Sequence, residues 1–255
     1  MDLPQIAIQI CTYNRYNEIR KTVEALQKYL IYPKEKITLY ICDDSSPGGY
    51  TQKLSRLNLF KYWTTHMVVT PSNVGWGGNV NHGLANIPEE IIFFIEDDYV
   101  LTKELDLRIG VLLLLEKSHI GMLRYRGTTG TRLVYHQFEA NISRWANVFS
   151  SAWYEGAPTV PYTFSYLHFD GNSPDIWLYS NGPHLKSKSF HDFYGPYPEG
   201  LKLGHTEESF AHLVKDKMRA DPTHAPAIVI LPEWIPMWFN HIGKSYQFTK
   251  EDIGG

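Results

Sequence analysis

The sequence contains little cysteine, no long apolar run and no excess of charge of one sign. Its 255 residues include two cysteines, Cys11 and Cys42, which both lie inside apolar runs. A disulfide framework is therefore not expected, and the low count is typical of a reducing compartment. The longest aliphatic cluster, residues 109–115, is too short to span a bilayer, and no basic stretch followed by an apolar stretch begins the chain. We expect a cytoplasmic location.

The charge balance also argues against a general affinity for polyanions. The formal net charge is −3, which provides no global attraction to nucleic acid or anionic lipid and makes nucleic acid a less favoured partner without excluding it. A hydrophobic content of 43% at this length is sufficient for one large domain with a substantial core. We expect a globular chain whose partners are identified by local motifs.

Strand and helix patterns alternate through the first hundred residues. Apolar runs rich in β-branched residues predict strands at 6–11, 37–42, 66–70 and 91–95. Helical spacing predicts helices at 14–30, 52–57, 79–86 and 105–117. This order predicts an α/β fold with a parallel sheet. After about residue 121 the alternation breaks, and we expect a strand near 161–169, a helix at 207–218 and a strand at 227–230.

Polar clusters follow three of the predicted strands. They are Cys11-Thr12-Tyr13-Asn14-Arg15, Asp43-Asp44-Ser45-Ser46 and Glu96-Asp97-Asp98. Because the carboxyl ends of parallel strands lie along one edge of a sheet, a single ligand could contact all three clusters. The alternative for each cluster is structural, since Thr12 or Asn14 could cap the next helix and Asp43-Asp44 could form an Asx turn.

The third cluster consists of three adjacent carboxylates, Glu96, Asp97 and Asp98. Their negative charges repel one another unless a cation neutralises them. Carboxylate oxygens suit Mg²⁺ or Mn²⁺, and such ions usually also hold substrate phosphates. The alternative is a strand followed by a solvated acidic turn.

Four motifs, in this order and spacing, resemble the GT-A glycosyltransferases of the family 2 type over roughly residues 5–105. They are the cluster at 11–15, Ile41-Cys42-Asp43-Asp44-Ser45-Ser46, Asn73-Val74-Gly75 with Asn79 and Asn81-His82-Gly83, and Glu96-Asp97-Asp98. The resemblance implies a Rossmann-like, mostly parallel central sheet flanked by helices, with a C-terminal region that shapes the acceptor pocket. Residues 1–120 would form the nucleotide-sugar-binding half of the domain, and residues 121–255 the acceptor-binding and catalytic-base half.

The resemblance also implies roles for individual residues. Tyr13 would stack on the nucleotide base, and Asp44 would accept a hydrogen bond from a ring N–H such as that of uracil. Asp98 would coordinate the divalent ion, whereas Glu96 would face the ribose or a metal-bound water and differs from the commoner Asp of the DxD motif. Asp97 has no assigned contact. The nucleotide-sugar-binding set is Cys11, Thr12, Tyr13, Arg15, Asp44, Asn73, Gly75, Asn79, Glu96 and Asp97.

Two further residues are assigned by the same resemblance. Glu208 in the predicted helix 207–218 would be the base that deprotonates an acceptor hydroxyl, which implies direct displacement with inversion. Thr206 could cap this helix, and acids in its first turn are also favoured by the helix dipole. His241 would be a second metal ligand, with Lys244 as an alternative contact to the diphosphate. Five aromatic residues could form an acceptor platform or belong to the core: Trp145, Trp153, Tyr154, Trp177 and Tyr179.

The leading hypothesis is a metal-dependent, inverting glycosyltransferase that uses a UDP-linked sugar and Mn²⁺ or Mg²⁺. Its acceptor would be a glycan, a lipid-linked glycan or a small molecule. A sugar-1-phosphate nucleotidyltransferase is the first alternative, but the loop at 11–15 contains no glycine for binding a triphosphate. The second alternative is a non-catalytic module that binds a carbohydrate or a nucleotide.

Overall fold

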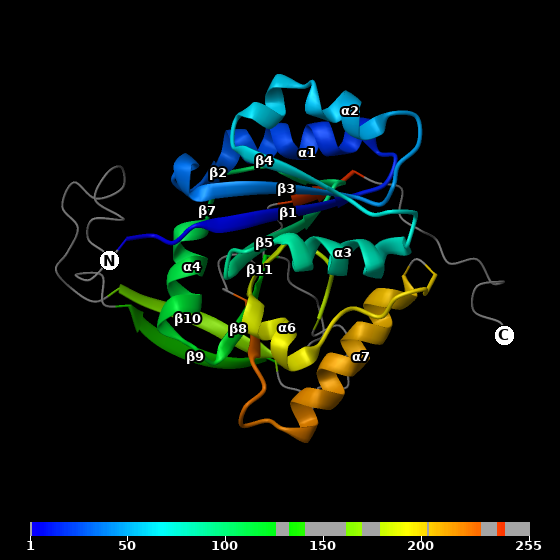
Figure 1. The fold of residues 1–255 in the computed structure, drawn as a ribbon. Helices are drawn as coiled ribbons and strands as arrows, with labels where there is room; N and C mark the ends of the chain where they lie inside the picture. Colours follow the sequence, from blue (N-terminus) through cyan, green and yellow to red (C-terminus); the bar gives the residue numbers. More distant parts are fainter. Residues whose placement is uncertain are drawn as a thin grey trace, which may run out of the picture.

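A computed structural model describes residues 2–125, 133–140, 162–169, 179–202, 204–230 and 239–242. A nine-stranded sheet crosses it in the order β4-β3-β1-β5-β11-β8-β12-β10-β9 (Figure 1). The strands are β1 (Ile6–Thr12), β3 (Ile37–Asp43), β4 (Thr64–Val69), β5 (Ile91–Glu96), β8 (Ile120–Arg124), β9 (Leu133–Ala140), β10 (Tyr162–Phe169), β11 (His184–Ser187) and β12 (Ala227–Ile230). Strands from both sides of residue 120 share this sheet.

Most strands of the sheet run in one direction. β4, β3, β1 and β5 pair in parallel, and β8 pairs in parallel with β12. β11 is antiparallel to both β5 and β8, and β10 is antiparallel to both β12 and β9. Only β11 and β10 are therefore reversed among the nine strands. The predicted α/β class with a mostly parallel central sheet is confirmed.

Helices cover both faces of the sheet (Figure 1). The α-helices are α1 (Tyr16–Tyr29), α2 (Tyr50–Ser55), α3 (Gly75–Asn86), α4 (Leu107–Glu116), α6 (Lys188–Tyr194) and α7 (His205–Ala220), and the short 3₁₀ turns are η1 (Lys34–Lys36) and η2 (Asn58–Lys61). Two short ladders lie beside the main sheet, one formed by β2 (Leu30–Ile31) with β7 (Leu105–Asp106) and one by β6 (Tyr99–Leu101) with β13 (Phe239–His241).

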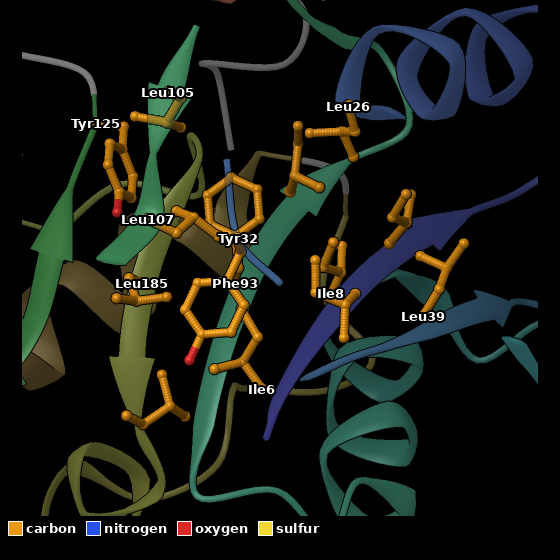
Figure 2. Packing of buried hydrophobic residues seen from close by; sticks show 14 of the residues in the cluster. Ile6, Ile8, Leu26, Tyr32, Leu39, Phe93, Leu105, Leu107, Tyr125 and Leu185 are labelled. Atoms are coloured by element: carbon orange, nitrogen blue, oxygen red, sulfur yellow. The ribbon is translucent and has the colours of Figure 1, made fainter. Parts of the chain in front are cut away.

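Successive side chains of each strand point to opposite faces of the sheet, which divides the core into two layers. Ile6, Ile8 and Ile10 of β1 pack into one apolar cluster with residues of α1 and α4, and Figure 2 shows part of this cluster around Phe93. The intervening Ala7 and Cys11 belong to a second cluster, which contains residues of α3, α6 and α7. Cys11 and Cys42 are buried free cysteines. Parallel strands covered on both faces explain the near-continuous apolar runs of the sequence.

Several predicted element boundaries differ from the structure. α3 begins at Gly75, one turn before the predicted start at residue 79, and α1 begins at Tyr16 rather than at residue 14. Residues 105–106 form β7 rather than the start of a helix, and the Asp106 carboxylate caps α4 by accepting a hydrogen bond from the Arg108 N–H at 3.0 Å. Among the described helices, none combines the length and the apolar character needed to cross a bilayer.

Candidate active site

A cavity of about 490 Å³ lies at the carboxyl ends of β1, β3 and β5 and at the start of α7. Every residue predicted to bind the nucleotide sugar lines it, as do both predicted metal ligands, Asp98 and His241. Glu208 is not among the lining residues. The cavity wall also contains residues that the sequence did not single out for ligand binding: Trp76, Asn181, Leu201, Gly204, Thr206 and Glu207.

One end of the cavity is formed by the loops after β1 and β3. Tyr13 is 47% exposed at this end, so one face of its ring is available to a ligand. The backbone adopts left-handed φ angles at Asn14 (54°) and Ser45 (59°). The Asn14 N–H donates to Ser46 Oγ at 2.7 Å, which joins the two loops. Asn14 and Thr12 therefore do not cap α1, whose first turn begins after Arg15 without a side-chain cap.

Asp44 organises the loop that precedes α3. Its Oδ1 accepts hydrogen bonds from the Val74 N–H at 2.8 Å and from Thr70 Oγ1 at 3.0 Å. Its Oδ2 accepts from the Gly75 N–H at 2.9 Å, where a φ of 79° favours glycine. Each carboxylate oxygen can accept more than one hydrogen bond. Asp44 can thus hold this loop and still face a ligand through Oδ2.

The Asp43 carboxylate fixes the loop after β3 by a hydrogen bond to the backbone three residues on, rather than two residues on as in an Asx turn. Its Oδ1 accepts from the Ser46 N–H at 3.2 Å, and its Oδ2 accepts from Thr51 Oγ1 at 2.8 Å. Asp43 is fully buried and does not line the cavity. Asp43 therefore holds the loop in place, whereas Asp44 lies at the cavity wall.

Glu96 at the end of β5 is held by a tryptophan. The Trp76 indole N–H donates to Glu96 Oε1 at 2.8 Å, and the Trp76 ring packs edge-on against Phe94 and Tyr197. Burial raises the pKa of Glu96 well above its usual range, and the charges of Asp98, Glu207 and Asp97 raise it further. The sequence did contain one indication that Trp76 is packed against other residues. In Gly75-Trp76-Gly77-Gly78 a large ring is flanked by glycines, which allow close packing.

Asp97 has a clear set of contacts. Thr12 Oγ1 donates to its Oδ2 at 2.7 Å, and the Arg15 guanidinium lies 3.3 Å from its Oδ1. Thr22 Oγ1 of α1 donates to the Asp97 carbonyl at 2.7 Å. Burial raises the pKa of Asp97 to about 7, although the hydrogen bond from Thr12 and the charge of Arg15 lower it. The side chain links the start of α1 to the end of β5.

Asp98 lines the cavity beside Arg15 and His241. Its Oδ2 contacts the Arg15 guanidinium and lies 3.2 Å from His241 Nε2. His241 is brought there by β13, which pairs with β6, and by the Ile242 N–H, which donates to the Asp98 carbonyl at 2.8 Å. The other oxygen, Asp98 Oδ1, is buried without a hydrogen-bond partner.

These two residues fit a divalent ion that completes its coordination with substrate oxygens. Within the described ranges, no group of three or more His, Cys, Asp or Glu side chains is placed to hold a metal ion by itself. Mg²⁺ and Mn²⁺ sites in nucleotide enzymes commonly use one or two protein ligands together with substrate phosphates. The unpartnered Asp98 Oδ1 and the nearby imidazole provide such a pair.

The start of α7 contributes a further part of the cavity wall. Gly204, with a φ of 88°, precedes the helix, and Thr206 is buried without capping it. Glu207 lines the cavity, and its Oε1 accepts from the Asn181 N–H at 2.7 Å. Glu208 follows on the same turn outside the lining. The geometry therefore favours Glu207 over the predicted Glu208 as the acid that can reach a ligand.

Of the five aromatic residues considered for an acceptor platform, only Tyr179 lies within the described part of the chain. Tyr179 is fully buried, so a platform role for this residue is wrong. The remaining members, together with Lys244, lie outside the described residues: Trp145, Trp153, Tyr154 and Trp177.

The mostly parallel sheet, covered by helices on both faces, defines a fold of the GT-A glycosyltransferase type. The model of the family described as glycosyl transferase family 2 matches residues 7–173, well over half of the chain, and the chain belongs to this family. A sequence comparison with curated proteins gives no match.

Two solved structures illustrate the shared fold. The S. aureus TarS 1–349 structure in complex with UDP-GlcNAc has a TM-score of 0.59 at 17% identity, covering 95% of this chain and 62% of that one. The mannosyltransferase PcManGT from Pyrobaculum calidifontis, in complex with GDP-Man and Mn²⁺, has a TM-score of 0.57 at 11% identity, covering 96% and 59%. In a longer TarS structure the match spans 35% of that chain. This chain thus corresponds to a part of these relatives.

Proposed function

We propose that this protein transfers a sugar from a UDP-sugar to an acceptor hydroxyl in a metal-dependent reaction that inverts the anomeric carbon. The observation that carries the proposal is that one cavity joins three kinds of group. Tyr13 and Asp44 are suited to a pyrimidine base, Asp98 and His241 are suited to a diphosphate-bound cation, and Glu207 lines the same cavity from the start of α7.

The assignment of a UDP-sugar as donor depends on the residues that would contact the nucleotide base. An exposed aromatic ring can stack on a base, and the Asp44 carboxylate can accept from the ring N–H of uracil. TarS, which shares the fold, is described in complex with UDP-GlcNAc, whereas PcManGT is described with GDP-Man. Both names describe nucleotide-diphosphate sugars, and the choice of UDP for this chain comes from its own Asp44.

The residues at the cation end would hold Mn²⁺ or Mg²⁺ through Asp98 and His241. When bound, such an ion supplies Lewis-acid stabilisation of the charge that develops on the leaving diphosphate. Arg15 lies between Asp97 and Asp98 with a half-exposed side chain, so its guanidinium offsets part of the negative charge at this end. Thr12 and Thr22 keep Asp97 turned toward Arg15.

Glu207 is the group best placed to take the proton of the acceptor hydroxyl. Because its Oε1 is engaged by the Asn181 N–H, its Oε2 is the oxygen left to face the acceptor. A single carboxylate base suits direct displacement, which inverts the anomeric carbon. The acceptor would be a glycan, a lipid-linked glycan or a small molecule.

The test is the Asp98→Ala variant, measured for UDP release from UDP-sugars with Mn²⁺ present. We expect release to fall at least a hundredfold, since a metal ligand is lost. The control is Asp221→Ala, which removes an exposed carboxylate outside the cavity lining and should leave UDP release unchanged. Unchanged activity of Asp98→Ala, or binding of ATP or NAD but of no nucleotide sugar, would overturn the proposal.

A further inference from the structure

A chain of hydrogen bonds connects the buried core to the cavity wall. Lys186 Nζ of β11 donates to Tyr197 Oη at 3.2 Å, and Tyr197 Oη lies 2.7 Å from Tyr179 Oη. Tyr179 Oη donates to Asn181 Oδ1 at 3.0 Å, and the Asn181 N–H donates to Glu207 Oε1 at 2.7 Å. Asn181 and Glu207 both line the cavity, whereas the first three residues are enclosed in the core.

The relay is defined as Lys186, Tyr197, Tyr179 and Asn181, which hydrogen bonds join in this order. A phenol has a single hydrogen, and an amide oxygen can only accept. Tyr179 Oη bonds both Asn181 Oδ1 and Tyr197 Oη, and Tyr197 Oη also accepts from Lys186. Tyr179 thus ties the side-chain amide of Asn181 to Tyr197 and, through Tyr197, to Lys186.

The relay is built into rigid surroundings. The Phe210 ring of α7 packs against Tyr179 with ring centroids 4.8 Å apart and against Tyr197 at 4.3 Å. Asn81 of α3 holds the Tyr197 backbone from the other side, accepting from its N–H at 3.0 Å and donating to its carbonyl at 2.9 Å. Neither tyrosine can therefore turn away without disturbing the packing of α7 or α3.

A buried lysine at the start of the relay is costly, because burial penalises a charged amine. The Lys186 Nζ lies 5.1 Å from the centroid of the Phe94 ring and 5.3 Å from that of Tyr197, so aromatic faces compensate for part of the lost hydration. Burial lowers the pKa of Lys186 to about 7. An apolar residue of similar volume would avoid this cost but would leave Tyr197 without a donor.

We propose that Lys186, Tyr197 and Tyr179 are positioning residues that orient Asn181 and, through its peptide N–H, turn Glu207 Oε2 toward the acceptor. The loop between Asn181 and β11 is fixed as well, because His184 Nδ1 bonds the Gly182 carbonyl at 2.9 Å and the Tyr125 N–H donates to the Pro183 carbonyl at 3.0 Å. The relay therefore determines only the orientation of Asn181 that this fixed loop leaves open. This inference rests on the proposed function, since it assigns the proton transfer to Glu207.

The test compares Tyr179→Phe with Tyr194→Phe in the full chain. Tyr194 belongs to the same buried aromatic cluster, but its hydroxyl donates to the Pro226 carbonyl at 2.8 Å, outside the relay. Tyr179→Phe loses two buried hydrogen bonds and Tyr194→Phe loses one, so both variants should have a lower thermal midpoint, Tyr179→Phe by the larger amount. We expect Tyr179→Phe to lower kcat about tenfold or more, with donor KM within about twofold, because the base is misplaced while the donor still binds. Tyr194→Phe should keep kcat within about twofold of the wild type.

Two further measurements keep the outcome decisive. Lys186→Met should lower kcat in the same way as Tyr179→Phe, and UDP binding, followed by the fluorescence of Trp76 in the cavity, should persist in all variants. If the wild type neither binds UDP nor transfers sugar, the proposed function fails. If the wild type transfers sugar and the two relay variants lose no more kcat than Tyr194→Phe, the relay is overturned.

Discussion

Neighbouring carboxylates at the cavity have different partners and therefore different roles. Glu96 is held by the Trp76 indole, and Asp97 accepts from Thr12. Among the three acids, only Asp98 has a buried oxygen without a hydrogen-bond partner. An unsatisfied buried carboxylate oxygen is costly unless a ligand completes it. This difference supports assigning the cation to Asp98 rather than to the triplet as a whole.

The choice between Glu207 and Glu208 is a prediction at the scale of one residue. We expect Glu207→Gln to lower transfer by a factor of about 10² to 10⁴, because the amide cannot accept the acceptor proton. Glu208→Gln is the matched control and should retain activity within a few-fold. Both variants keep the shape of the side chain, so UDP-sugar binding should be unchanged. Initial rates of sugar transfer distinguish the two assignments. A large loss of activity confined to Glu208→Gln would support the assignment made from the sequence.

The buried Lys186 makes a prediction about stability and pH. Its pKa is about 7 in the folded protein and about 10.4 when unfolded. Between these values the unfolded chain binds more protons, so this residue makes stability rise with pH by up to about 1.4 kcal/mol per unit. Below pH 7 the amine is charged in both states, and its full burial cost applies.

Lys186→Met removes this titration and isolates its effect. The stability of the variant relative to the wild type should be greatest near pH 7 and should decrease steadily toward pH 9.5. Denaturant unfolding of both proteins at three pH values in this window measures the difference in the free energy of unfolding. A difference that stays constant with pH would contradict a lowered lysine pKa.

At the scale of elements, α3 shows that packing outweighs intrinsic propensity. Its 12 residues, Gly75-Trp76-Gly77-Gly78-Asn79-Val80-Asn81-His82-Gly83-Leu84-Ala85-Asn86, include four glycines, although glycine costs about 1 kcal/mol relative to alanine within a helix. A Cβ on Gly77 would lie 2.1 Å from the Pro198 carbonyl oxygen, and one on Gly83 would lie 2.3 Å from Gln9 Nε2. Glycine therefore allows α3 to approach the sheet and the segment before α7.

Gly77→Ala should destabilise the protein despite the better helix propensity of alanine. The added methyl group meets backbone at Pro198 and lies 3.1 Å from Thr206 Cγ2, so the segment leading to Glu207 must shift. We expect a loss of about 1–3 kcal/mol in denaturant unfolding and a reduced kcat. Ala85→Ser, which adds one atom at an exposed position of α3, should change neither quantity by much. Wild-type stability in Gly77→Ala would show that the two segments do not pack in this way.

At the scale of the whole molecule, the cavity is assembled from distant parts of the chain. The first half provides the ends of β1, β3 and β5, while α7 and β13 bring Glu207 and His241 from the second half (Figure 1). β11 runs antiparallel between β5 and β8, which places the Asn181 loop beside the ends of the parallel strands. Both halves of the chain are therefore needed to enclose one ligand.

The sequence by itself determined the order of strands and helices in the first half and the polar clusters at the strand ends. These features are local, because periodic apolar residues and turn residues report the pleat and its termination without knowledge of the partner strands. Parallel strands then bring their ends together by geometry alone. The predicted ligand residues from Cys11 to Asp98 consequently share one cavity wall.

Only the tertiary structure decided which of two adjacent acids faces that cavity. Successive helical residues point about 100° apart, so the rotation of α7 selects between them. That rotation is set by the left-handed Gly204 and by the burial of Phe210 against Tyr179 and Tyr197, which no short-range pattern in the sequence reveals. For the same reason, the contacts of Trp76 with Glu96 and of Asn181 with Glu207 emerged only once the distant segments were packed together.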